Sequence, residues 1–179
     1  VVAAMTVPNL MGAVEDKELS AQAKKAYNTL QNAISMKYSL TRLTPGDIGE
    51  NQLFSGLLAG DQAPTLKWIE RSGNVIQTPD GAVMTSRTTT NTCDSSVSAT
   101  NTCIVKVDVN GSDGPNFSGI ENGTTASGMQ LKQFSYSAPT GGTTYNRAQR
   151  DIVYFTVDGL SVTPNRNHGV TARYFTGKK

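Results

Sequence analysis

Residues 24–39, KKAYNTLQNAISMKYS, decide the fold, because they carry an apolar stripe at helical spacing. Apolar side chains that recur every three or four positions lie on one face of a helix, and polar residues cover the opposite face. Helix-forming sequence continues upstream, so residues 1–40 are predicted to form one long helix. Its stripe consists of Ala23, Tyr27, Leu30, Ile34 and Tyr38.

The start of this helix, VVAAMTVPNLMGAV at 1–14, is apolar nearly all round. Such a helix must be buried in protein or lipid, so the two halves of the helix meet different environments. Pro8 is expected to kink or loosen the first half. The alternative is a shorter amphipathic helix that begins near Asn9. No positively charged segment precedes the apolar stretch, which therefore does not resemble a signal peptide, and we expect further sequence upstream of it.

The rest of the chain changes to the two-residue period of strands. Asp47 follows a Pro-Gly turn and is predicted to cap a short second helix that ends at Gly60. Alternating segments around Pro79-Asp80-Gly81, and around an Asp158-Gly159 turn, predict two β-hairpins. Further strands are predicted at 103–109, 129–137 and 170–175. The predicted class is α+β: a helix at 1–40 packed on an antiparallel sheet at 41–179, with polar loops.

Composition excludes several functional classes. The chain of 179 residues fits one domain. Only 17% of residues are charged and the net charge is +2, which excludes a strongly basic nucleic-acid protein and an acidic tail protein. One His and two Cys exclude a zinc site with four such ligands. No run reaches the roughly 18 apolar residues that a membrane-spanning helix needs.

Catalytic motifs are lacking, and we expect no enzyme. His168 lies in the turn-rich stretch PNRNHGV, which favours a solvated loop histidine over a general base. Glu15, Asp16 and Glu18 spread over several faces of the helix, which favours a solvated surface over a catalytic carboxylate pair.

Cys93 and Cys103 are separated by nine residues. That spacing is poor for a redox pair and favours a structural disulfide over free thiols. On the chain-entropy view, closing so small a loop contributes roughly 3 kcal/mol of stability. The bridge implies an oxidising compartment.

The stretch VDVNGSDGPN contains closely spaced side-chain oxygens in a glycine-rich turn. Calcium loops begin in this way, although position six lacks the usual Gly and position twelve lacks Glu. A turn in which Asp and Asn bond their own backbone is the alternative, and it is favoured. Asp47, Asp151 or a backbone carbonyl could complete a calcium shell. The candidate ligands are Asp108, Asn110, Ser112 and Asp113.

The apolar start, with Ala3 to Thr6 followed by Val7-Pro8, resembles the later part of the N-terminal helix of type IV pilins and type II secretion pseudopilins. The helix KKAYNTLQNAISMKYS is similar in character. TPDGAVM, CIVKVDVNGSDGPN and DIVYFTVDG resemble the sheet of such proteins, with residues 117–150 as an insertion.

The resemblance implies a structural filament subunit with a pilin-like fold. Its partners would be copies of itself and other pilins, with the inner membrane as its location before assembly and the cell surface afterwards. The filament-core helix would present Val7, Pro8, Leu10, Met11 and Val14.

Two filament roles remain as alternatives. One is a secretion pseudopilin, which a calcium site would favour. The other is a minor pilin that acts as an adhesin or as a receptor for DNA uptake. No specific nucleic-acid binding is predicted, because dispersed basic residues more often form a solvated face. Those residues are Lys132, Arg147, Arg150, Arg166, Arg173, Lys178 and Lys179.

Overall fold

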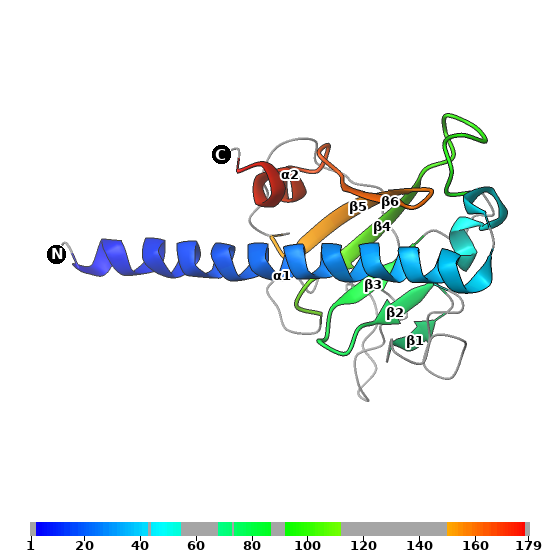
Figure 1. Ribbon diagram of the computed structural model, residues 1–179. Coiled ribbons are helices and arrows are strands. Elements are labelled where there is room, and N and C mark those ends of the chain that lie inside the picture. Colours follow the sequence, from blue (N-terminus) through cyan, green and yellow to red (C-terminus); the bar gives the residue numbers. More distant parts are fainter. Residues whose placement is uncertain are drawn as a thin grey trace.

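A computed structural model describes residues 3–42, 44–54, 68–72, 74–86, 92–111 and 150–177. A long helix is followed by an antiparallel sheet and a short C-terminal helix, so the predicted α+β class is confirmed (Figure 1). The helices are α1 (Ala3–Thr41) and α2 (Gly169–Thr176), with two 3-10 turns, η1 (Pro45–Asp47) and η2 (Glu50–Gln52). The strands are β1 (Ile69–Ser72), β2 (Val75–Gln77), β3 (Val83–Thr85), β4 (Cys103–Asp108), β5 (Ile152–Asp158) and β6 (Ser161–Pro164).

Helix α1 is continuous over 39 residues and runs through Pro8. The alternative of a helix beginning near Asn9 is therefore wrong, and Pro8 does not unwind the helix. Proline lacks the N–H that would bond to the carbonyl four residues earlier. At Pro8 that carbonyl belongs to Ala4, so the helix continues through this position without that one backbone bond.

The apolar stripe of α1 lies across one face of the sheet and forms the core with it. Tyr27 is half-buried and packs against Phe155 and Phe175, with ring centroids 5.7 Å apart in both pairs. Full burial of a Leu or Ile side chain contributes roughly 1.5–3 kcal/mol. The buried residues of α1 in this core are Leu19, Ala23, Ala26, Leu30, Ala33, Ile34 and Tyr38.

The six strands follow one another in the sheet in the order of the sequence, and every neighbouring pair is antiparallel. The predicted hairpin around Pro79-Asp80-Gly81 and the predicted strands at 103–109 and 151–157 are confirmed. In the last hairpin, Asp158 pairs with Ser161, so the connecting residues are Gly159 and Leu160 rather than Asp158 and Gly159. Gly159 has a φ of 57°, a conformation that glycine adopts without steric cost.

The segment after α1 differs from the prediction. Instead of one helix capped by Asp47, the chain forms η1 and η2. The carboxylate of Asp47 accepts bonds from the amide and the hydroxyl of Thr44, which closes the turn locally. Ile48 and Leu53 are buried as core residues. Residues 55–67, which include the predicted helix end at Gly60, lie outside the described residues, as does the strand predicted at 129–137.

The strand predicted at 170–175 is wrong, because this segment forms α2. Val170 and Tyr174 are four residues apart and both buried, a spacing that suits a helix. His168 caps the first turn, and Gly177 ends the helix in the left-handed conformation. The caps at both ends favour the helix over the predicted strand.

Cys93 and Cys103 form the predicted disulfide, and both are fully buried. The loop between them is tied to the β5–β6 turn. Ser95 donates from its amide and its hydroxyl to the carboxylate of Asp158, at 2.8 and 2.6 Å. The disulfide ties this exposed loop to the start of β4, and the bonds from Ser95 tie the same loop to the end of β5.

We expect the C93S/C103S variant to lose about 3 kcal/mol of unfolding free energy, because the unfolded chain regains the entropy of the opened loop. Urea unfolding of the variant and of the wild type would measure this. The same comparison with S96A, an exposed change inside the loop, serves as the control. Equal midpoints for C93S/C103S and the wild type would contradict the expectation.

Candidate functional site

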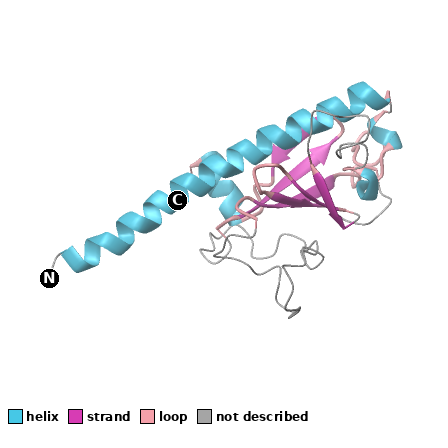
Figure 2. Ribbon diagram, turned by 90° about the horizontal axis from the view of Figure 1, so that it is seen from below, coloured by secondary structure: helices cyan, strands magenta, loops and turns pink. Residues whose placement is uncertain are grey.

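Helix α1 extends beyond the sheet at its N-terminal end, as both views show (Figures 1 and 2). Val14 belongs to the N-terminal part of α1 and is 59% exposed. The predicted filament-core positions Val7, Pro8, Leu10 and Met11 all precede it in α1; their side chains lie outside the description.

Two ion pairs hold α1 where it leaves the domain. Glu15 pairs with Arg150 at 2.6 Å and Asp16 pairs with Arg173 of α2 at 2.8 Å. The hydroxyl of Tyr174 in α2 donates to the carbonyl of Arg150 at 2.7 Å. This bond links Arg150 to the helix that carries Arg173. Glu15 and Asp16 therefore anchor the helix to the C-terminal part of the chain, a role that their sequence spacing did not indicate.

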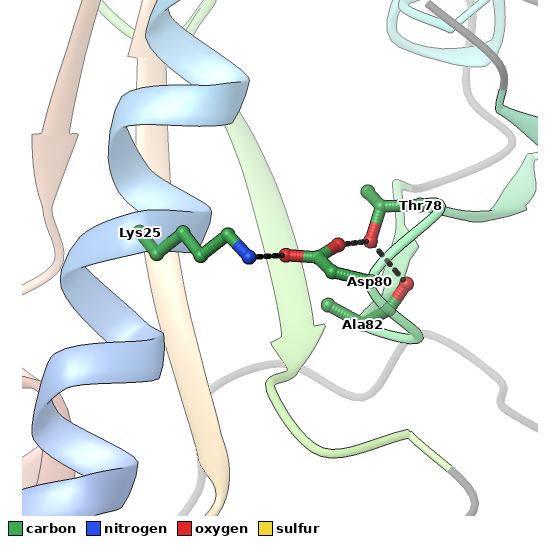
Figure 3. A network of polar contacts seen from close by, with 4 residues as sticks. All are labelled: Lys25, Thr78, Asp80 and Ala82. Atoms are coloured by element: carbon green, nitrogen blue, oxygen red, sulfur yellow. Dashed lines mark hydrogen bonds and ion pairs between the residues drawn. The ribbon is translucent and has the colours of Figure 1, made fainter.

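A third ion pair connects the middle of α1 to the β2–β3 hairpin (Figure 3). Lys25 approaches the carboxylate of Asp80 at 3.0 Å, and Thr78 donates to the same carboxylate. Desolvation of Asp80 acts against its charge, but the bonds from Thr78 and Lys25 together lower its pKa below the usual range. The Pro-Asp-Gly turn was visible in the sequence. Its partner on α1 was not, because the two residues lie far apart along the chain.

The acidic turn follows β4. Asp108 is buried, and its Oδ1 accepts a bond from the amide of Gly111 at 2.9 Å. Gly111 has a φ of 62°, and a Cβ placed there would lie 2.2 Å from the carbonyl oxygen of Gly81. Only glycine fits at this position. The bond from Gly111 to Asp108 is of the local side-chain-to-backbone kind that the turn interpretation expects.

Asp151 is fully buried beside this turn, and its carbonyl accepts a bond from the amide of Val109 at 3.0 Å. Burial, together with the charge of Asp151, raises the pKa of Asp108 to about 8, against the opposing effects of the backbone bonds from Gly111 and Asn110 and of the charge of Lys106. The structure therefore brings together Asp108 and Asp151, two buried carboxyl groups that repel one another when both are charged.

Of the four candidate calcium ligands, Asp108 and Asn110 are in the turn, and Ser112 and Asp113 lie outside the described residues. Asp47 belongs to η1 and is followed by Ile48, whose carbonyl accepts a bond from the amide of Cys93. This contact lies near the opposite end of β4 from the acidic turn. The described part of the chain contains no group of three or more His, Cys, Asp or Glu side chains that could hold a metal ion.

The segment after α1 is held by two buried charged residues. Lys37 donates to the carbonyl oxygens of Gln52 and Leu53, at 3.1 Å for Leu53, and burial lowers its pKa to about 8. Glu50 accepts a bond from the amide of Ile104 in β4 at 3.2 Å. These side chains bond backbone groups at the end of η2 and near the start of β4.

The prediction that His168 is a solvated loop residue is wrong. Its side chain is 4% exposed, accepts a bond from the amide of Thr171, and lies edge-on to Tyr154 with ring centroids 4.7 Å apart. Burial lowers the pKa of His168 to about 4, so the imidazole is neutral at physiological pH. These contacts describe a helix cap.

The dispersed basic residues, for which a solvated face was favoured over a DNA-binding patch, are partly engaged in ion pairs. Arg150 and Arg173 form the ion pairs with Glu15 and Asp16, while Arg166 is exposed. Lys132, Arg147, Lys178 and Lys179 lie outside the described residues.

Comparison of the chain with protein-family models, with curated proteins and with solved structures found no match. Within the described residues, no helix has the length and apolar character needed to cross a membrane.

His168 gives a pH dependence that can be measured directly, since it is the single histidine of the chain. Its native pKa of about 4 lies below the usual 6.5, so the unfolded state binds more protons between these values. The contribution of His168 to the unfolding free energy is therefore complete above pH 6.5 and decreases as the pH falls toward 4, by up to about 3 kcal/mol.

An NMR titration of the imidazole should give a midpoint near 4. The H168N variant keeps a capping side chain that does not titrate, so the unfolding free energy of the wild type should fall relative to that of H168N as the pH decreases from 6.5 toward 4. A midpoint above 6, or parallel profiles for the two proteins, would contradict the expectation.

Proposed function

We propose that this chain is a structural subunit of a bacterial type IV pilus or pilus-like filament with a pilin-like fold. The projection of α1 beyond the sheet is the observation that carries this proposal. A helix of 39 residues whose later part is built into a domain, and whose earlier part is apolar and extends away from it, suits assembly through helix bundling.

In such a filament the projecting segments would pack together in the centre and the sheets would face outward. Val7, Leu10, Met11 and Val14 would contribute the apolar contacts. The ion pairs of Glu15 and Asp16 would carry load between this bundle and the sheet, because they lie where the helix leaves the domain. The resemblance further implies anchoring in the inner membrane before assembly and copies of this chain or other pilins as partners.

A matched pair of substitutions tests this proposal in the bacterium that produces the protein. Val14 is 59% exposed on α1 and Val97 is 60% exposed on the disulfide loop, so V14K and V97K make the same change at equally exposed positions. We expect V14K to abolish filaments, since a charge would be buried in the bundle, whereas V97K should preserve them.

The measurements are electron microscopy of the cell surface and immunoblotting of the sheared filament fraction, with total subunit as reference. Both purified variants should keep the thermal stability of the wild type, because neither position is in the core. Normal filaments from V14K, or a wild-type protein that is found only as dispersed subunits, would contradict the proposal.

A second candidate is a pseudopilin of a type II secretion system, and the buried pair of Asp108 and Asp151 favours it. Oxygen ligands with two carboxylates suit calcium, and a bound cation would relieve the repulsion that raises the pKa of Asp108. Asp108, Asn110 and Asp151 would hold the ion, together with Ser112 and Asp113. The adhesin and DNA-uptake alternatives draw less support, because Arg150 and Arg173 are already in ion pairs.

Calcium binding predicts a higher melting temperature in millimolar calcium than in chelator, at a pH above 8 where Asp108 is charged. D108N keeps an oxygen that can accept from Gly111 but removes the charge, so it should lose most of the calcium response. It should also be more stable than the wild type in chelator at this pH, since the repulsion is gone. An unchanged wild-type melting temperature would discard the calcium site.

A further inference from the structure

Strand β6 is at one edge of the sheet, and its outer backbone groups are bonded by side chains of α1. Gln31 donates from Nε2 to the carbonyl of Leu160 at 2.9 Å and accepts at Oε1 from the amide of Val162 at 3.0 Å. Tyr27 donates from its hydroxyl to the carbonyl of Val162 at 3.0 Å.

The side-chain amide of Gln31 thus supplies a donor and an acceptor to this edge, as one residue of a neighbouring strand would. It bonds the carbonyl of Leu160, in the turn just before β6, and the amide of Val162 in β6, and Tyr27 bonds the carbonyl of Val162. Backbone groups that point outward alternate along a strand, so the next outward position after Val162 is Pro164. Proline has no N–H to offer there.

An edge strand with free N–H and C=O groups is a template for pairing with another chain. We propose that Gln31 and Tyr27 hold the β6 edge closed against strand addition, and that the latent partner is the β6 edge of a second copy of this chain. The same short strand of a second copy offers complementary backbone groups in antiparallel orientation. This inference concerns the sheet edge and does not depend on filament assembly.

The local structure supports a fixed position for the Gln31 amide. Ser35 lies one turn further along α1, and its hydroxyl donates to the carbonyl of Gln31 at 2.9 Å and is 3.4 Å from Nε2. The aromatic ring of Tyr27 packs against Phe155 and Phe175, which also contact each other. Both side chains therefore have contacts besides those to the β6 edge that hold them in place.

The test uses Q31M, which preserves length and helix propensity but removes both hydrogen bonds. Q22M is the matched control, because Gln22 is on the same helix and its buried Oε1 has no hydrogen-bond partner among the described residues. In dilute solution, where Q31M is still monomeric, we expect amide exchange of Val162 to become roughly 5- to 30-fold faster than in the wild type. We also expect Q31M to reach twice the monomer mass with rising concentration in light scattering, while Q22M behaves as the wild type does.

The double variant Q31M/T163K identifies the contact. Thr163 is exposed on β6, and a lysine on an edge strand opposes edge-to-edge pairing. A return to the monomer mass supports the proposal, whereas dimers that persist in the double variant overturn it. Unchanged mass or unchanged exchange in Q31M also overturns it. If near-ultraviolet circular dichroism shows that Q31M is unfolded, Q31A replaces it and is judged by the same results.

Discussion

Burial of the apolar stripe of α1 against one face of the sheet is the constraint on which the rest of the structure depends. The sheet alternates its side chains between two faces, and the face toward α1 carries the larger core. Leu30 and Ile34 are fully buried at the centre of this contact. This packing fixes the rotational orientation of α1 about its axis. That orientation decides which polar side chains of α1 meet the sheet.

The polar contacts along α1 follow from that rotation. Asp16, Lys25, Gln31 and Lys37 lie beside the stripe and each bonds a different part of the domain: α2, the β2–β3 hairpin, the β6 edge and η2. Exposed ion pairs such as the one between Lys25 and Asp80 contribute little energy individually. Their effect is to fix the position of the helix along its axis, and with it the length that projects from the domain. For a filament subunit, this projecting length sets the distance between the helix bundle and the outer sheet.

The buried charges show a different use of the interior. Glu50 and Lys37 are charge-bearing groups bonded to backbone, so their burial is compensated by hydrogen bonds. Asp108 and Asp151 are two carboxyl groups in one buried place, and charge on one disfavours charge on the other. Glu50 and Lys37 stabilise the segment that follows α1. At Asp108 and Asp151, binding of a proton or of a cation would relieve the repulsion between the two carboxylates. The raised pKa of Asp108 is the physical sign of that difference.

The sequence by itself determined the elements whose patterns are local. The stripe from Ala23 to Tyr38 specified α1, the Pro-Asp-Gly turn specified the β2–β3 hairpin, and the spacing of Cys93 and Cys103 indicated their bridge. Only the tertiary structure decided that 170–175 is helical, that His168 is buried, and that Gln31 covers the β6 edge. Short segments follow their caps and their packing partners more than their own propensity. Contacts between residues more than a hundred positions apart exist only after α1 has docked on the sheet.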